Sequence, residues 1–231
     1  MKDEDFTPSA VFAVTIDQRR STTRADRVPA LLERLTRLPD LLLLPERTAG
    51  DEVQLLLAGP EAVAELVEAV TRQGEWWVGI GIGDVDTPLP SSTRAARGSA
   101  YLSARSAVDR SHQSPTGLAL DVLPARAVRR TVTGGPYGEL MSTSTEVTTL
   151  ARHAEAALWL QQSLLARRSA QGWEVTDLLD AGASVADVAA RLGISASAVS
   201  QRHARAGREQ GLRGRELCAT LLGQLQRAVA A

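Results

Sequence analysis

The first half of the chain alternates short apolar runs with amphipathic stretches, a pattern that indicates a mixed fold. Strands are predicted over residues 10–16, 41–44, 53–58, 76–83 and 117–122, and helices over 26–37, 60–73 and 98–111. The order β-α-β-β-α-β, followed by one more helix and strand, predicts an α+β fold of the ferredoxin-like or palm (nucleotide cyclase-like) type, with helices on one face of an antiparallel sheet. Glycines alternate with larger residues in 76–83, so close approach of a neighbouring backbone is expected there.

The second half of the chain has helical periodicity. A long amphipathic helix is predicted over 146–169 and a closing helix over 216–229. Between them, segment 173–181 precedes a helical hairpin at 185–206. Residues 131–145 are polar and glycine-rich, and we expect a linker or a flexible loop there.

The hairpin at 185–206 has the spacing of a helix-turn-helix, because Ala189, Gly193 and Val199 fall at offsets of four and six. Small Ala189 allows the two helices to approach closely, and Gly193 supplies the turn. The other residues expected to build the motif are the caps Ser184 and Ser195 and the inward-facing Val185, Val188, Leu192, Ile194 and Ala206.

The second helix of this motif is expected to enter the major groove of double-stranded DNA. Between residues 191 and 215 the chain has six arginines and one acidic residue, Glu209. The candidate DNA-binding residues are Ser195, Ser197, Ser200, Gln201, Arg202, Arg205 and Arg208.

Two-helix corners without DNA function also show this spacing, so an ordinary helical hairpin is the alternative. His203 stands four residues after Val199, where comparable recognition helices carry a leucine. We expect His203 to be a half-buried, hydrogen-bonded side chain, and a phosphate contact is the second interpretation.

Length and composition fit two domains. The 231 residues are 44% hydrophobic, enough for a degenerate cyclase- or palm-like domain over 8–130 and a helical, helix-turn-helix domain over 146–231. No run approaches the roughly 20 apolar residues that span a bilayer, and the start MKDED is unlike a signal peptide. We therefore expect a cytoplasmic protein with no membrane partner. Cys218 is the single cysteine, which excludes an internal disulfide and suggests a core position.

Charge differs between the two halves. Residues 1–145 hold 16 basic and 19 acidic side chains, whereas 146–231 hold 10 and 8. Electrostatics therefore assign nucleic acid to the C-terminal part. The chain has no asparagine, and Lys2 is its only lysine.

Two strand ends carry carboxylates that a palm-like sheet would bring together. Asp17 ends the first strand, and Asp51 and Glu52 lie at the turn between the second and third strands. Mg²⁺ bound to a nucleotide phosphate takes one or two carboxylates, so Asp17 and Asp51 are candidate metal ligands. Together with Glu52 and Arg105, they are the candidate ligand-binding residues. The alternative is that Gly50 and Asp51 form a turn chosen for its backbone conformation, while Asp17 caps the following segment.

Four segments within residues 10–125, namely TIDQRRS, AGDEVQLLL, VGIGIGDV and GSAYLSARSAV, resemble the SatD family. The hairpin is also similar to nucleotide cyclase and GGDEF domains. This resemblance implies a cyclase-like palm, and a family described as DNA-binding agrees with an appended helix-turn-helix. The residues that match are Asp17, Ser21, Gly50, Asp51, Glu52, Gln54, Gly98, Ala100, Tyr101, Ala104 and Arg105.

Several positions depart from that family pattern and count against catalysis. They are Ile16 in place of a glycine, Arg97 in place of an acid, Ser99 in place of a proline and Leu102 in place of a histidine. Cyclase-like sites also use an Asn and an Arg to stabilise the developing charge and a Lys to read the purine. The chain has no asparagine, and Lys2 precedes the first strand. Arg105 is left to bind a phosphate or to pair with an acid of the fold.

The sequence therefore predicts a sequence-specific DNA-binding transcriptional regulator that is not an enzyme and needs no cofactor. Its catalytically degenerate palm is a sensor or dimerisation domain, with Mg²⁺ or a nucleotide as the conceivable ligand. The alternative is a metal-dependent, cyclase-like nucleotidyl enzyme with a DNA-binding module. A pure interaction protein is disfavoured by the arginine-rich face. Helices 146–169 and 216–229 carry surplus apolar positions, which predicts a homodimer.

Overall fold

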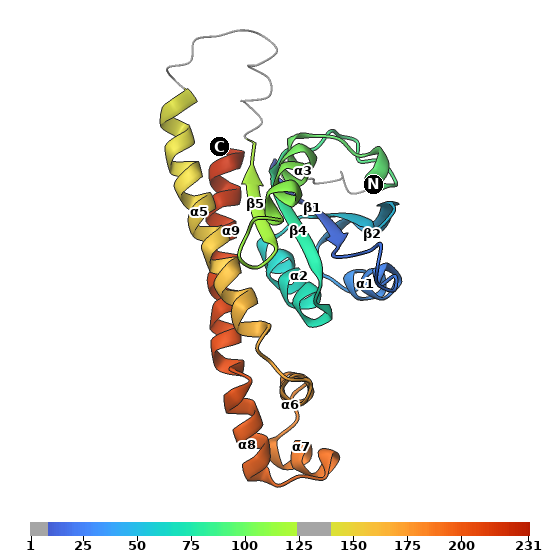
Figure 1. The fold of residues 1–231 in the computed structure, drawn as a ribbon. Helices are drawn as coiled ribbons and strands as arrows, with labels where there is room; N and C mark the ends of the chain where they lie inside the picture. Colours follow the sequence, from blue (N-terminus) through green and yellow to red (C-terminus); the bar gives the residue numbers. More distant parts are fainter. Residues whose placement is uncertain (1–8, 124–139) are drawn as a thin grey trace, which may run out of the picture.

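A five-stranded mixed sheet forms one lobe of the computed structural model, which describes residues 9–123 and 140–231 (Figure 1). The strands are β1 (Val11–Gln18), β2 (Leu41–Ala49), β3 (Glu52–Leu57), β4 (Trp76–Gly83) and β5 (Leu118–Val122). Their order is β2-β3-β1-β4-β5, and only the β4 and β5 pair among them is parallel. All five predicted strands are present, but the predicted antiparallel sheet is wrong. Helix α3 (Ser99–Ser111) crosses over between β4 and β5, which makes that pair parallel.

Alternation along the strands gives the sheet two apolar faces. Phe12 and Ile16 of β1 belong to a core that α1 (Val28–Leu35) and α2 (Pro60–Gln73) cover. Ala13 points to the opposite face and packs in a second cluster with side chains of α3. Helices therefore cover both faces, which corrects the expectation of a single covered face.

The glycines of β4 let α3 approach the sheet closely. A Cβ atom at Gly79 would lie 2.2 Å from the backbone nitrogen of Val108, and one at Gly81 would lie 2.1 Å from that of Ala104. Non-bonded atoms do not approach so closely, so both positions exclude any side chain. The close backbone approach expected at 76–83 is confirmed.

Two long helices, α5 (Leu140–Leu165) and α9 (Arg208–Ala230), lie side by side against the sheet (Figure 1). Each begins earlier in the chain than predicted, so part of the expected linker at 131–145 is helical. Residues 131–139 of that linker lie outside the described residues. No helix in the described ranges has both the length and the apolar character needed to cross a membrane.

Side chains of α5 occupy the outer edge of β5. The backbone nitrogen of Leu120 donates to Glu155 Oε1 at 2.9 Å, and Trp159 Nε1 donates to the carbonyl oxygen of Leu118 at 2.7 Å. Unpaired N–H and C=O groups at a sheet edge can otherwise form hydrogen bonds with a strand of another chain. These hydrogen bonds fix α5 to the sheet.

One hydrophobic core joins the sheet to both long helices. Leu158 of α5, and Cys218 and Leu222 of α9, are fully buried in the same cluster as the strands and α2. The core position expected for Cys218 is confirmed. The chain itself buries most of the apolar positions of α5 and α9 that the sequence analysis counted as surplus. Leu160 and Leu217 remain exposed, at 71% and 51%.

Three short helices form the second lobe, at the lower end of the molecule in Figure 1. They are α6 (Ala170–Asp180), α7 (Val185–Leu192) and α8 (Ala196–Arg205). The segment 146–231, predicted as one helical domain, thus contributes α5 and α9 to the sheet lobe and α6 to α8 to this second lobe.

Candidate functional sites

The predicted caps and glycine turn of the hairpin formed by α7 and α8 are present. Ser184 Oγ accepts from the backbone nitrogen of Asp187 at 3.2 Å, and the Asp187 carboxylate accepts from the backbone nitrogen of Ser184 at 3.1 Å. This capping box starts α7. Gly193 ends α7 with φ +65°, a left-handed conformation that favours glycine, and Ser195 caps α8 through the backbone nitrogen of Ala198 at 3.1 Å.

A small apolar core holds α6, α7 and α8 together. Val175, Val188 and Val199 are each fully buried, and the predicted corner residue Ile194 packs against them. Val185 was expected to be buried, but it is 37% exposed because it lies in the first turn of α7, away from this core. The predicted helical hairpin of α7 and α8 is otherwise present and packs against α6.

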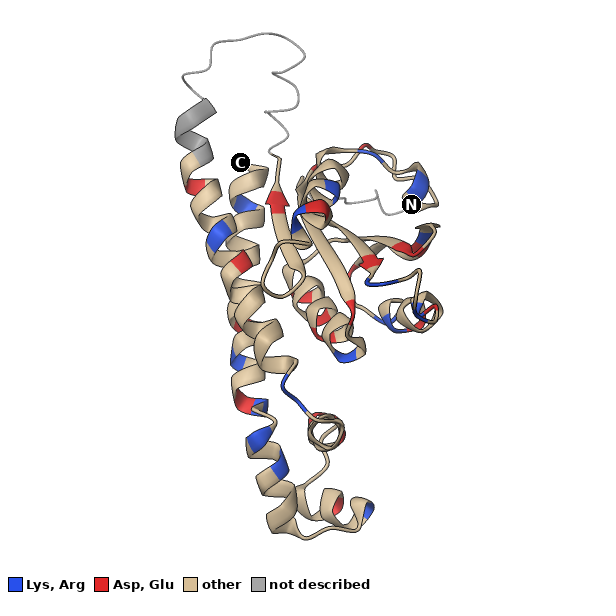
Figure 2. Cartoon of the chain, in the orientation of Figure 1, with Lys and Arg blue, Asp and Glu red and all other residues tan. Residues whose placement is uncertain are grey.

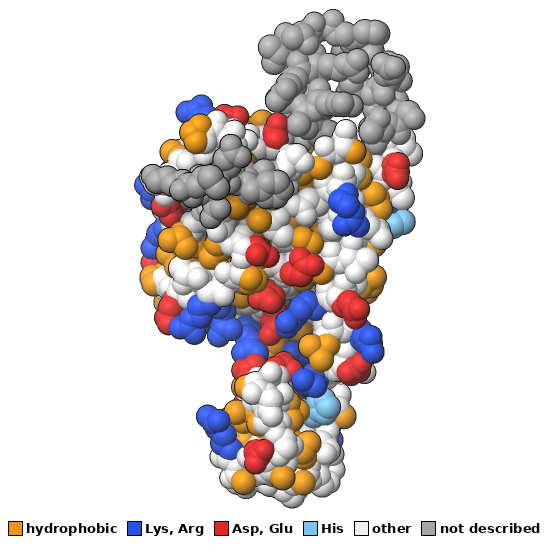
Figure 3. Space-filling model, turned by 180° about the vertical axis from the view of Figure 1, so that it is seen from behind, with side chains coloured by type: hydrophobic (Ala, Val, Ile, Leu, Met, Phe, Trp, Pro, Cys, Tyr) orange, Lys and Arg blue, Asp and Glu red, His pale blue; other side chains and the backbone are white. Residues whose placement is uncertain are grey.

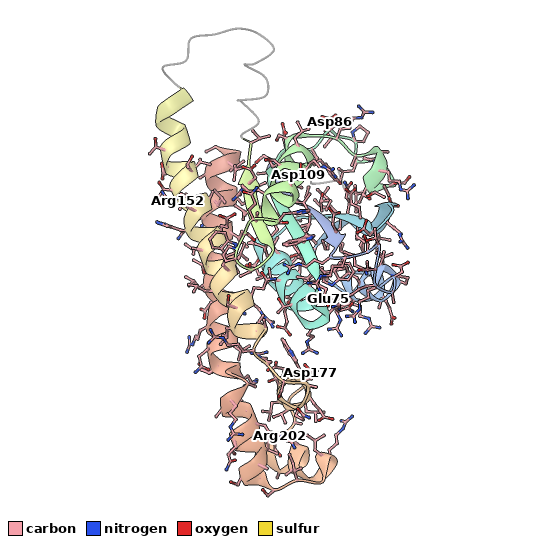
Figure 4. The ribbon with its side chains drawn as sticks, viewed as in Figure 1. Glu75, Asp86, Asp109, Arg152, Asp177 and Arg202 are labelled. Carbon is pink, nitrogen blue, oxygen red and sulfur yellow. The ribbon has the colours of Figure 1, made fainter. Side chains whose placement is uncertain are left out.

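The outward face of α8 carries most of the candidate DNA-binding residues. Five of them are exposed, namely Ser195, Ser197, Ser200, Gln201 and Arg205. Arg202 is partly buried. Ser200 donates back to the carbonyl oxygen of Ala196, whereas Gln201, Arg202 and Arg205 have no hydrogen bond or ion pair within the described part of the chain. Figure 2 shows basic residues along α8 and the first turns of α9, and Arg202 is labelled in Figure 4. This face offers free cations and one free amide to a ligand.

Two predicted roles in this region differ in the structure. Arg208 was expected to contact phosphate, but its guanidinium pairs with Asp180 of α6 at 2.6 Å. His203 is partly buried as predicted, yet it makes no hydrogen bond among the described residues. Arg208 therefore ties α9 to α6 in this structure.

The sheet brings together two of the predicted carboxylates. Asp17 of β1 lies directly opposite Glu52 of β3 in the antiparallel register, so both side chains leave the same face of the sheet. Asp51 lies in the turn before β3 and is near enough to raise the pKa of Asp17. The carboxylates at the ends of β1 and β3 therefore lie together as predicted, and Glu52 is the one directly opposite Asp17.

Partners within the chain occupy both oxygens of Glu52. Thr48 and Gln54 donate to Oε1, and Arg105 Nη1 lies 2.7 Å from Oε2. Of the two open interpretations of Arg105, the ion pair within the fold is the one present. The described residues contain no group of three or more His, Cys, Asp or Glu side chains that could hold a metal ion. Glu52 is therefore engaged within the chain and has a guanidinium beside it, whereas Mg²⁺ binding by Asp17 and Asp51 stays a prediction.

Asp17 is the least satisfied member of this cluster. Its Oδ1 atom is buried and has no hydrogen-bond partner within the described residues. Burial and the neighbouring carboxylates of Glu52 and Asp51 raise the pKa of Asp17 to about 6, against the opposing effects of Arg105 and His112. The site is thus an acidic cluster with one oxygen left unpaired.

Aromatic stacking next to Asp17 was not predicted from the sequence. Trp77 lies opposite Asp17 on β4, and its ring stacks on His112 with centroids 4.7 Å apart. The guanidinium of Arg19 lies 3.8 Å from the centre of the Trp77 ring. These residues come from three distant segments, so no local spacing indicates their contact.

A polar joint between the two lobes was also missed. Arg72 at the end of α2 forms a two-pronged ion pair with Asp177 of α6, with one nitrogen to oxygen distance of 2.8 Å. The guanidinium groups of Arg72 and Arg168 lie 4.0 and 4.5 Å from the centre of the Trp173 ring. We call Arg72, Arg168, Trp173 and Asp177 the lobe joint. Figure 3 shows acidic and basic side chains gathered where the lobes meet, and Figure 4 labels Asp177 there.

Comparison with known proteins adds no family assignment. No protein-family model matches the chain, and no curated protein matches it either. The resemblance to the SatD family therefore stays a prediction from the sequence.

Proposed function

We propose that the protein is a sequence-specific DNA-binding transcriptional regulator, with α8 as its recognition helix. The observation that carries this proposal is the outward face of α8. There Gln201, Arg202 and Arg205 have no partner among the described residues, and both helices of the hairpin are capped. Gln201 is suited to read an adenine edge, and Arg202 and Arg205 are suited to phosphates. Serines at 195, 197 and 200 add short hydroxyl donors around them.

We further infer that the sheet domain is a degenerate cyclase-like palm without catalytic activity. The strand order β2-β3-β1-β4, with β1 between β3 and β4, supports a palm or ferredoxin-like arrangement extended by β5. The Arg105 guanidinium held by Glu52 supports a structural role for part of the carboxylate cluster. A site that binds a nucleotide without selectively stabilising the transition state does not accelerate its reaction.

The metal-dependent nucleotidyl enzyme is the second candidate, and the unpartnered oxygen of Asp17 favours it. In that function, Asp17 and Asp51 would bind Mg²⁺ and a nucleotide would lie against Arg105. Overnight incubation with ATP or GTP and Mg²⁺, followed by chromatography, is expected to give no product. A cyclic or linear nucleotide product that disappears in Asp51→Ala would replace the regulator proposal with the enzyme.

We infer that two copies bind neighbouring half-sites, since one helix-turn-helix makes few contacts and paired half-sites lie roughly 34 Å apart. Exposed Leu160 and Leu217 are apolar positions left available for contact between copies.

Selection from a random duplex library with the purified full chain tests DNA binding and pairing together. The expected result is a discrete motif with two-fold symmetry, protected in a footprint. Enrichment of no motif, with binding that depends on duplex length alone, would contradict sequence-specific regulation.

A further inference from the structure

Two short segments of the chain connect the second lobe to the long helices of the sheet lobe. Residues 166–169 lead from α5 into α6, and residues 206–207 lead from α8 into α9 (Figure 1). The conformation of these two connections sets the angle between α8 and the long helices. Gly207 interrupts the helical path from α8 to α9, since its φ of +59° is a left-handed conformation that favours glycine.

The side chain of Arg168, in the first connection, binds the backbone of the second connection. Its Nε atom donates to the carbonyl oxygen of Ala206 at 2.7 Å, and its Nη2 atom donates to that of Gly207 at 3.3 Å. Carbonyl groups at the C-terminal end of a helix lack partners within the helix, and a basic side chain can satisfy them. Arg168 therefore caps the end of α8 and ties the two connections together.

Contacts with α6 and α9 complete the surroundings of the Arg168 guanidinium. Its centre lies 4.5 Å from the centre of the Trp173 ring of α6. Gly211 of α9 leaves space for the guanidinium, because a Cβ atom at that position would lie 2.2 Å from Nη2. The hydrogen-bond and stacking partners of Arg168 in the described part of the chain are neutral groups. These contacts depend on the planar shape of the guanidinium, which a lysine lacks.

We propose that Arg168 is a positioning residue, which fixes the recognition helix α8 at one angle to α5 and α9 without touching DNA. The second lobe cannot rotate about Gly207 unless the hydrogen bonds of Arg168 break or its stacking on Trp173 is lost.

A fixed angle has a consequence for the DNA that two copies can bind. Two copies whose lobes are held rigidly can contact two half-sites together at only one separation. Arg168 should therefore determine the spacing of the half-sites. This consequence rests on the proposed DNA-binding function, whereas the positioning role itself does not.

Distance measurements between two spin labels on the full chain test the angle without DNA. Leu44→Cys on β2 and Ala186→Cys on α7 place the labels at exposed positions, and native Cys218 is fully buried. We expect one narrow distance distribution in this labelled parent. Arg168→Met should broaden it, because methionine lacks the hydrogen bonds and the planar group. An equally narrow distribution in Arg168→Met would overturn the proposal, even if its melting temperature falls.

Gly211→Ala separates the position of the lobe from the stability of the helix. The added Cβ would take the place of Nη2 and displace the Arg168 guanidinium, while alanine has a higher helix propensity than glycine. We therefore expect a distance distribution as broad as that of Arg168→Met, with α9 still folded. The matched control is Arg167→Met, since Arg167 is exposed and its side chain has no partner among the described residues. A narrow distribution in Gly211→Ala, or a broad one in Arg167→Met, would contradict the assignment.

Duplexes with two half-sites at different separations test the consequence for DNA. Moving the half-sites two base pairs away from the selected spacing should weaken binding of the parent about fivefold or more. It should leave binding of Arg168→Met nearly unchanged, and both proteins should bind a single half-site equally. If the change of spacing weakens both proteins to the same extent, Arg168 does not determine the spacing. If the parent selects no duplex while the label distances behave as expected, the proposed DNA function fails and the positioning role stands.

Discussion

Replacement of Arg72 by alanine should release the second lobe without unfolding the sheet. The Arg72 side chain is 17% exposed, and its ion-pair partner Asp177 is 48% exposed. With Asp177 so accessible, the ion pair is worth about 1 kcal/mol, and the stacking on Trp173 adds about 1 kcal/mol. The variant should therefore lower the stability of the second lobe by about 2 kcal/mol. Arg72→Lys keeps the charge but loses the planar fork, so we expect a loss of about half that size.

Native-state hydrogen exchange measures this effect segment by segment. A loss of about 2 kcal/mol should reduce the protection of α6 amides about 30-fold, while amides of β1 keep their protection. The matched control is Arg213→Ala, since Arg213 is 73% exposed and its ion pairs within the described residues are with Glu209 and Glu216 of its own helix. We expect it to change α6 protection by less than about twofold. If Arg72→Ala and Arg213→Ala have the same effect on α6, the lobe joint does not hold the second lobe.

Three further predictions follow from the fold. The pKa of Asp17 is about 6 in the folded chain and 3.8 in its reference state, so the native state binds more protons and stability should fall as pH rises between these values. Asp17→Asn should abolish that fall and, after allowance for solvent screening, raise the free energy of unfolding at neutral pH by on the order of 1 kcal/mol. The same pH dependence of the free energy of unfolding in variant and parent, measured with urea, would refute this prediction. Gly81→Ala should cost at least about 2 kcal/mol in urea unfolding because its Cβ meets the backbone of α3, whereas Gly223→Ala, whose Cβ has only ordinary contacts, should cost nothing. Light scattering without DNA should give the monomer mass of 24.6 kDa, and a mass twice as large would show that the copies pair without DNA.

Local chemistry made most elements predictable from the sequence. The limits of α2 and β4 are those predicted, because Pro60 begins the helix after Gly59, Gly74 ends it, and Gly83 is the last residue of the strand. The serine caps and Gly193 likewise define α7 and α8 through contacts within a few residues. Because these hydrogen bonds join residues that are close in sequence, the residue types at those positions predict them.

Helix α9 was predicted too short because its glycines argue against a helix. A Cβ at Gly211 would lie 2.2 Å from Arg168 Nη2, and one at Gly214 would lie 2.0 Å from Gln161 Oε1. Side chains of α5 and of the segment after it occupy the space beside these glycines, an arrangement that only the folded chain reveals.

Contacts between distant segments explain the rest of what sequence reasoning missed. Arg72 and Asp177 are 105 positions apart, and no periodicity relates them. The covering of the second sheet face by α3 depends on the direction of a crossover, which the hydrophobic pattern does not encode. A cavity lined in part by Trp76 of β4 and Gln162 of α5 likewise forms only when α5 docks on the sheet.

The most direct test of the account compares Gln201→Ala and Arg205→Ala on the duplex selected by the parent protein and on single-base variants of it. Gln201→Ala should lose about 1 to 3 kcal/mol of discrimination at one base pair. Arg205→Ala should weaken all duplexes evenly and reduce the salt dependence by about one unit. Parent-like affinity and specificity in both variants would show that the outward face of α8 does not read DNA.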